Sequence, residues 1–403
     1  MASTWTFFRC RSVRLSVKEK QEALSMKFMK ILPVLAMLWL TGISLPAKTY
    51  TLVSLNCYGF PEKTRDLVKF FAKRDLASGI NHSIGARIPM IAKFIATLKP
   101  DIVCFQELWG EQNKRAMMQQ LGNVYQYTYN KLLYHQMHIT KLDDGLMVCT
   151  LRHAFKDEWL TFKISRDEDA LAMKGFLIIA LHNFQFDAVG NAKDHPLLVV
   201  DTHMQSGTNL ADVEVKRDQV KQIAEELVNL RKSDSRLNAA NLVLCGDWNE
   251  PITYLKNESR IYDRTRWILD LFNSFGFNLS NDQRLQELRR EYKLDTIAEI
   301  HELDKVGRLQ VAGGQRKPLT EHLDAIGQFR SSWGWDYWPA STDPDGKQIL
   351  DHVFVEDNHL RLKNYRVFRK EILGGTGLDK LYDPAKAMSD HAAIAVELEP
   401  LPW

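Results

Sequence analysis

Residues 241–251 read Asn-Leu-Val-Leu-Cys-Gly-Asp-Trp-Asn-Glu-Pro, a short apolar run that passes directly into polar residues. The run over 241–245 has the length and the composition of a buried β-strand. Asp247 and Asn249 then stand where that strand should end. One such residue is most often part of a turn, but the same pattern recurs along the chain, and its recurrence is informative about the fold.

Seven further apolar runs have strand length and are rich in β-branched or aromatic residues. Between them, apolar residues at helical spacing predict helices over 88–98, 212–231 and 268–275, the first stopped by Lys99-Pro100-Asp101. Strands interleaved with helices, with hairpin-like stretches over 146–181, indicate an α/β sandwich rather than an all-parallel sheet. The seven runs cover residues 50–55, 102–105, 146–150, 175–181, 197–200, 350–355 and 392–398.

No internal repeat or Gly/Ser/Pro-rich linker divides residues 48–403, which predicts a single domain. Residues 281–349 are polar with few strand signals, and we expect a variable insertion or long loop there. It contains Trp333, Trp335 and Trp338. Such aromatic residues suit either a membrane-touching loop or a small satellite core under a long loop.

The first 47 residues are predicted to be a leader that ends in a secretory signal peptide, from Met26 to Ala47. Lys27 and Lys30 precede an apolar stretch over 31–45, and Pro46-Ala47 supplies a small-residue cleavage point. The stretch is shorter than the ~20 residues of a spanning helix. We therefore expect export to the periplasm or beyond the cell, with an N-terminal membrane anchor as the alternative.

The charge distribution bears on the choice of partner. The formal net charge is +3, but the leader carries seven basic and two acidic side chains, so the remainder is close to neutral. Sequence-independent nucleic-acid binding usually depends on a broad basic surface, so nucleic acid is the less favoured substrate. The five cysteines show no metal-binding spacing, and those at 57, 104, 149 and 245 lie within apolar runs, which predicts buried structural thiols.

Six apolar runs stop at, or contain, residues with carboxylate, amide or imidazole side chains. Strand ends converge on one edge of a sandwich, so these side chains are expected to lie together. Carboxylate and amide oxygens suit Mg²⁺, which also keeps waters and substrate phosphate as ligands, and a His beside an Asp can deprotonate an attacking water. The residues are Asn56, Glu107, His203, Asp247 with Asn249, Asp351, and Asp390 with His391.

The ordered set LNCYG (55–59), FQELW (105–109), DTHMQ (201–205), CGDWNEP (245–251), LDHVF (350–354) and MSDHAAI (388–394) resembles the endonuclease/exonuclease/phosphatase superfamily. The resemblance covers about residues 50–398, apart from the insertion. It implies a deoxyribonuclease-like fold, that is, a four-layer α/β sandwich of two mixed β-sheets flanked by helices.

The resemblance also implies roles for individual residues. Glu107 would be the principal metal ligand, with Asn56 and Asp390 in or near the metal shell. His391 would be the general base, oriented by Asp351. Asp247 and Asn249 would position the water and hold a phosphate oxygen, while His203 would stabilise the charged phosphorane or assist the leaving group.

The segment DALAMKGF over 169–176 is similar to a stretch of secreted bacterial sphingomyelinases and their neutral animal relatives. In it, Lys174 is either a phosphate-binding residue or a solvated lysine at the start of a strand. The resemblance implies a metal-dependent phosphodiesterase that hydrolyses sphingomyelin at a membrane surface, with Mg²⁺ as cofactor, Mn²⁺ or Co²⁺ as substitutes, and no obligate protein partner. A secreted deoxyribonuclease-type endonuclease and an inositol-phosphate phosphatase are the alternatives within this fold, and a binding module with a degenerate site is the alternative outside it.

Overall fold

The described part of the chain contains all the strands, catalytic residues and metal ligands predicted above. The predicted signal peptide and the three tryptophans Trp333, Trp335 and Trp338 lie outside it. The sandwich belongs to one compact unit, formed by Ala47–Gln185 and Lys193–Trp403. The computed structural model describes residues 49–59, 83–130, 143–186, 192–207, 210–255, 260–291, 293–294, 296–303, 308–311, 316–318, 348–356, 360–368, 371–372, 374–377, 380–382 and 387–401.

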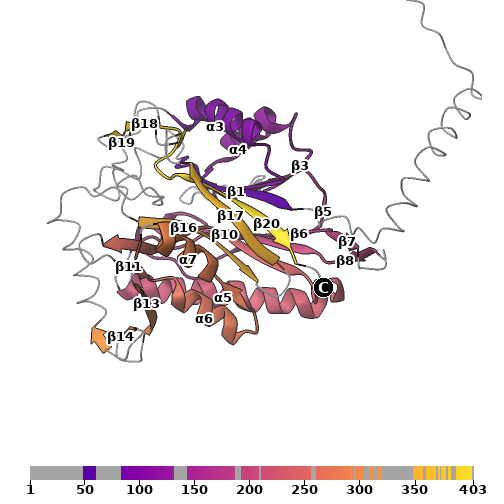
Figure 1. Ribbon diagram of the computed structural model, residues 1–403. Helices are drawn as coiled ribbons and strands as arrows, with labels where there is room; N and C mark the ends of the chain where they lie inside the picture. Colours follow the sequence, from indigo (N-terminus) through magenta and orange to yellow (C-terminus); the bar gives the residue numbers. More distant parts are fainter. Residues whose placement is uncertain are drawn as a thin grey trace, which may run out of the picture. The chain divides into compact units, whose positions relative to one another are not determined.

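The first sheet has six strands in the order β17-β20-β1-β2-β4-β3 (Figure 1). β1 and β2 are parallel, whereas the other neighbours are antiparallel. The sheet is therefore mixed, as predicted. The strands are β1 (Tyr50–Asn56), β2 (Ile102–Gln106), β3 (Tyr127–Tyr129), β4 (Met147–Thr150), β17 (Leu360–Phe368) and β20 (Ala393–Pro400).

The second sheet is also mixed. Its main path is β15-β14-β13-β11-β10-β9-β6-β5, and β16 pairs with β10 and β12. Its strands are β5 (Ala154–Thr161), β6 (Gly175–Leu181), β9 (Leu197–His203), β10 (Asn241–Leu255), β11 (Arg260–Asp263), β12 (Leu279–Ser280), β13 (Thr296–Leu303), β14 (Arg308–Val311), β15 (Arg316–Pro318) and β16 (Gln348–Glu356). Two further strand pairs are β7 (Phe184–Phe186) with β8 (Ala192–Asp194) and β18 (Gly374–Gly377) with β19 (Lys380–Tyr382).

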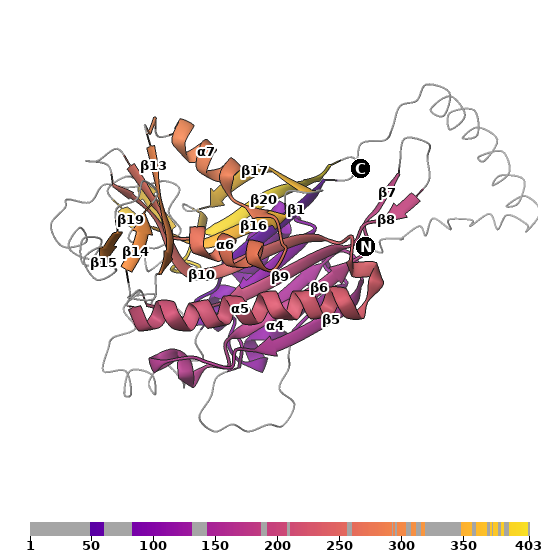
Figure 2. The same cartoon turned by 90° about the horizontal axis from the view of Figure 1, so that it is seen from below.

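Helices cover both outer faces of the paired sheets (Figures 1 and 2). Alternation along β1 explains the layers: Leu52 lies in the core between the sheets, whereas Val53 lies in the core under α3 and α4. A third core joins α5 and α6 to the second sheet, so the predicted four-layer sandwich is confirmed. The helices are α3 (Ile84–Leu98), α4 (Glu111–Leu121), α5 (Leu210–Ser233), α6 (Arg266–Ser274) and α7 (Asp282–Glu291), with 3₁₀ turns η1 (Asp167–Leu171) and η2 (Ser235–Leu237).

All eight predicted strands and all three predicted helices are present. The predicted stop of α3 is also correct, because Lys99 caps it in the left-handed conformation. The insertion over 281–349 differs from expectation, since it contributes α7, β13, β14 and β15 where the sequence indicated few strands. These strands alternate apolar with polar residues or are very short, so they lack the apolar runs that identified the buried strands. Within the described residues, no helix combines the length and apolarity required to span a bilayer.

Candidate active site

The strand register brings the predicted polar residues to one edge of the sandwich. In the first sheet, Asn56 is paired with Gln106, the residue before Glu107. In the second sheet, Asp247 is paired with His203 on one side and with Asp351 on the other. Parallel neighbours end at the same edge, which is why residues far apart in the chain meet there.

Asn56 connects the two sheets at the centre of the site. Its Nδ2 donates to Glu107 Oε1 and to Asp247 Oδ2, both at 3.0 Å. His203 Nε2 lies 3.5 Å from Glu107 Oε1 and 3.7 Å from Asp247 Oδ2. The predicted Glu107, Asn56, His203 and Asp247 therefore form one cluster, all buried or nearly so.

His391 and Asp351 form the second half of the site. His391 Nδ1 lies 2.8 Å from Asp351 Oδ2, and its Nε2 lies 4.0 Å from Asp247 Oδ2. Burial tends to lower the pKa of His391, but the charge and hydrogen bond of Asp351, with Asp247 and Asp390, raise it well above its ordinary value. Asp351 thus orients the ring so that Nε2 is the atom directed toward Asp247.

Two buried carboxylate oxygens indicate a cation site. Glu107 Oε2 and Asp390 Oδ1 are buried without a hydrogen-bond partner among the described residues. Burial raises the pKa of Asp390 to about 7; His391 opposes this shift and the charge of Glu107 adds to it. Burial also raises the pKa of Asp247 to about 6. Oxygen atoms that are buried, unpaired and mutually repelling fit a hard divalent cation. Two groups of three side chains each bring one donor atom per residue within 4.8 Å of the others: Glu107, His203 and Asp247, and Asp247, Asp351 and His391.

Glu107 and Asn249 hold left-handed backbone conformations, with φ of 53° and 50°. Such strain costs a non-glycine residue about 1 kcal/mol or more and persists only where the surroundings enforce it. For Glu107, the carbonyl accepts from Gly59 N at 2.7 Å, and a Cβ on Gly59 would meet that carbonyl oxygen at 2.4 Å. For Asn249, the backbone N–H donates to Asp247 Oδ1 at 2.9 Å. Both strained residues thus have specific restraints.

Lys216 and Arg87 are fully buried positioning residues that sequence reasoning missed. Lys216 Nζ donates to the carbonyls of Gly207 and Asn249 and to Glu250 Oε2, the last at 3.0 Å. Arg87 donates to the carbonyls of Cys57 and Tyr58, which follow Asn56, and to that of Met388. Nothing in the sequence distinguishes either residue from an ordinary solvated cation on a helix.

Gln219 supports the segment that follows His203. Its Oε1 accepts from the backbone N–H of Gln205 at 2.9 Å.

Lys174 lies beneath the site rather than in solvent, with an exposed fraction of 3%. Its Nζ lies 2.7 Å from Asp169 Oδ1 and donates to the Met204 carbonyl at 2.9 Å. Burial, with the positive charges of Lys174 and His391, lowers the pKa of His203 well below the ordinary value. His203 is therefore a neutral imidazole at neutral pH. A contact between Lys174 and substrate stays a prediction.

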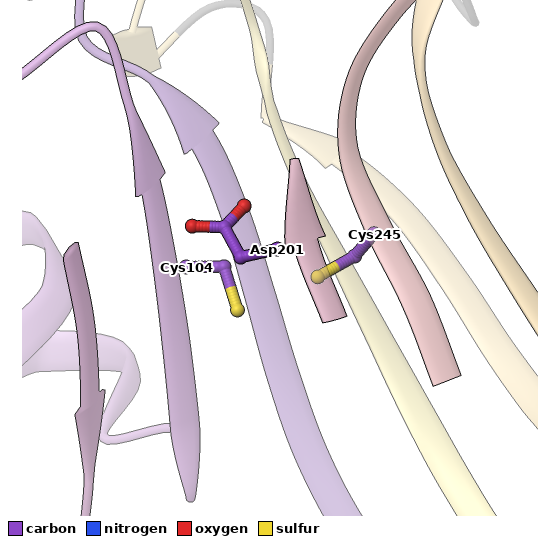
Figure 3. A group of neighbouring side chains, drawn as sticks. All are labelled: Cys104, Asp201 and Cys245. Atoms are coloured by element: carbon purple, nitrogen blue, oxygen red, sulfur yellow. The ribbon is translucent and has the colours of Figure 1, made fainter. Parts of the chain in front are cut away.

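The four cysteines among the described residues, Cys57, Cys104, Cys149 and Cys245, are buried and free, as predicted. Cys104 and Cys245 lie close to Asp201 (Figure 3). They belong to the core between the sheets, where β2 of the first sheet faces the neighbouring strands β9 and β10 of the second. Asp201 is fully buried and accepts from Gln106 Nε2 at 2.6 Å, and burial raises its pKa well above the ordinary value. This cluster packs directly beneath the strand ends that carry Glu107, His203 and Asp247.

Replacement of Asp351 by asparagine is expected to move the acid limb of the pH–rate profile to lower pH. A general base must be neutral, and Asp351 is the strongest of the groups that raise the pKa of His391. The plateau rate should also fall by about 10²-fold or more, because ring orientation and tautomer are lost. Initial rates across the pH range measure both effects, and an unmoved limb would contradict the assignment of His391 and Asp351 as one unit.

Sphingomyelin phosphodiesterase 5 of Danio rerio is 25% identical over 195 residues, which cover 44% of this chain and 34% of that protein. The chain thus spans about a third of the length of that relative.

Two solved structures are similar at low identity. Sphingomyelinase C from Streptomyces griseocarneus is 13% identical with a TM-score of 0.47, covering 87% of this chain and 99% of that one. D. rerio TDP2 complexed with single strand DNA product is 12% identical with a TM-score of 0.45 and the same coverage. Similarity at this level carries no information about the substrate of this chain.

The family itself is defined by a match over most of the sequence. Residues 53–391 match the model of the Endonuclease/Exonuclease/phosphatase family. The match begins within β1 and ends at His391, just before β20, so it includes the other strands of both sheets and every residue of the cluster described above. The chain therefore belongs to the endonuclease/exonuclease/phosphatase family of phosphoester hydrolases.

Proposed function

We propose that this chain is a Mg²⁺-dependent phosphodiesterase that hydrolyses sphingomyelin to ceramide and phosphocholine. The observation that carries the phosphodiesterase chemistry is the pair of unpartnered buried oxygens, Glu107 Oε2 and Asp390 Oδ1, beside the oriented base His391. The similarity to a sphingomyelin phosphodiesterase supports the choice of substrate. Export through the predicted signal peptide, to where a lipid surface would be met, is part of the same proposal.

The residues divide the chemistry among them. His391 takes a proton from the attacking water at Nε2, while Asp351 holds Nδ1. As the bond from the water oxygen to phosphorus forms, the bond from phosphorus to the ceramide oxygen breaks. His203 is kept neutral by burial and offers an N–H to the charge that develops.

Asn249 and Asp247 hold the water and a phosphate oxygen at the second sheet. Bound at Glu107 and Asp390, with Asn56 beside them, Mg²⁺ would neutralise charge on the phosphoryl oxygens. The backbone of Asn249 is held in place for this role, because its N–H donates to Asp247 and its carbonyl accepts from Lys216.

Removal of divalent metal is expected to abolish phosphocholine release from sphingomyelin vesicles, and added Mg²⁺ should restore it. The measurement uses the purified full chain before and after a chelator. Bis(p-nitrophenyl) phosphate and plasmid DNA serve as parallel substrates. Metal-dependent cleavage of DNA with no phosphocholine release would keep the family chemistry and overturn the lipid substrate, whereas chelator-resistant release would overturn the metal.

A further inference from the structure

Large exposed apolar side chains are few in the described part of the molecule: Met90, Leu151 and Ile164, with exposed fractions of 41%, 40% and 46%. Two of them flank the same strand, because Leu151 precedes β5 and Ile164 follows it. β5 has eight residues, which span roughly 26 Å at about 3.3 Å per residue. The two side chains therefore lie at opposite ends of the sandwich.

The register of the second sheet places Ile164 at the catalytic edge. Thr161, the last residue of β5, is paired with Gly175, and Phe176 is paired with Thr202, the residue before His203. At the other end, Ala154 is paired with Leu181, which is paired in turn with Leu197. Leu151 thus lies at the edge away from the active site.

The segment that carries Ile164 is anchored, so the exposure of this side chain is imposed by the fold. Phe162 is buried in the core between the second sheet and its helices. The carbonyl of Ile164 accepts from Gln219 Nε2 at 3.0 Å, and the backbone N–H of Arg166 donates to Gln205 Oε1 at 2.9 Å. Because Gln205 lies two residues after His203, this segment is attached directly to the wall of the active site.

Cationic side chains stand on both sides of Ile164. Lys163 is exposed, whereas Arg166 is 39% exposed and lies between two carboxylates, with Asp212 Oδ1 3.8 Å and Asp167 Oδ2 4.0 Å away. An exposed aliphatic side chain beside an exposed lysine is the chemistry that contacts a bilayer surface. The aliphatic group enters the boundary between headgroups and acyl chains, and the lysine meets lipid phosphates.

We propose that residues 162–166 dock the enzyme on a phospholipid bilayer, with Ile164 inserted and Lys163 against lipid phosphates. This inference rests on the proposed function, because a bilayer docked at the catalytic edge would bring a lipid phosphodiester to His391. Charge complementarity and the position of Ile164 at that edge favour a bilayer as the occupant over a partner protein.

The test compares Ile164→Glu with Leu151→Glu, which places the same charge at a similarly exposed site on the far edge. Binding to vesicles of sphingomyelin and phosphatidylcholine is measured by sedimentation with a chelator present. Turnover is measured with Mg²⁺ on those vesicles and on short-chain sphingomyelin dissolved below its micelle concentration. The Ile164 variant should lose vesicle binding and vesicle turnover by about tenfold or more, with turnover of the dissolved lipid changed less than about twofold.

The Leu151 variant should match wild type in all three measurements. Equal losses of vesicle binding in the Ile164 and Leu151 variants would overturn the docking site. So would a loss of turnover on dissolved lipid as large as the loss on vesicles. An Ile164 variant that binds vesicles like wild type would also overturn it and would leave residues 162–166 to a protein partner. If vesicle binding depends on Ile164 but neither substrate releases phosphocholine, the proposed function is refuted and the docking surface is supported.

A second variant tests the electrostatic part of the site. Lys163→Glu should weaken binding to vesicles that contain phosphatidylserine by about fivefold or more at low salt, since each cation near an anionic surface contributes measurably and is screened by salt. Vesicles without phosphatidylserine should show a smaller change. Equal loss on both vesicle types at every salt concentration would contradict a role for this charge.

Discussion

Replacement of Glu107 by glutamine is expected to lower turnover by about 10³-fold or more while the protein remains folded. Glutamine keeps the volume of the side chain and an oxygen that can accept from Asn56 Nδ2, but it removes the negative charge. Burial raises the pKa of Glu107, so the charged carboxylate is costly unless a cation is bound. The loss should therefore fall on metal binding and on the reaction rather than on folding.

Two measurements separate these effects. Phosphocholine release gives the turnover, and the melting temperature with and without Mg²⁺ reports binding, because a ligand that binds only the folded state raises it. Glu107→Gln should lose most of the Mg²⁺-dependent rise, whereas Glu111→Gln on the exposed first turn of α4 should keep both the rise and the activity. A Glu107 variant with wild-type turnover would disprove the metal assignment.

Replacement of His391 by alanine should reduce turnover by about 10² to 10⁴-fold, the usual contribution of a positioned general base. The imidazole is 12% exposed, so a small base can reach the space that its removal leaves. Added imidazole should therefore restore part of the rate. His182→Ala, at the far end of β6, should leave the rate unchanged and supplies the matched control.

The pair His391 and Asp351 offers a further check through the double variant. Because Asp351 acts only through the ring that it orients, removing both residues should cost about as much as removing His391 alone. Additive losses would show that Asp351 has a separate function in the reaction. A His391 variant with unchanged turnover and no response to imidazole would remove this residue from the mechanism.

The local pattern of apolar and polar residues was sufficient to predict much of the fold. The eight buried strands were predictable because each is a continuous apolar run, a consequence of layers on both faces of the sheets. The strands of the insertion were not predictable, because β13 alternates polar and apolar residues and β15 has only three. The predicted signal peptide and the tryptophans Trp333, Trp335 and Trp338 stay predictions.

The identities of the site residues also followed from sequence, since each stands at the end of a strand or within a motif of fixed order. Their mutual contacts did not. Asn56 meets Asp247 across 191 positions of the chain, and only the register of two sheets and their packing could bring the two side chains within 3.0 Å.

The same holds for the residues that support the site. Lys216 and Arg87 follow no motif and become recognisable only through the carbonyls that they contact. The pKa of His203 and that of His391 move in opposite directions, although both are histidines beside the end of a strand. Sequence determined which side chains stand at the catalytic edge, because that depends on local periodicity. Tertiary structure alone decided which of them are charged and which are paired, because burial and the distance between charges are properties of the packed sheets.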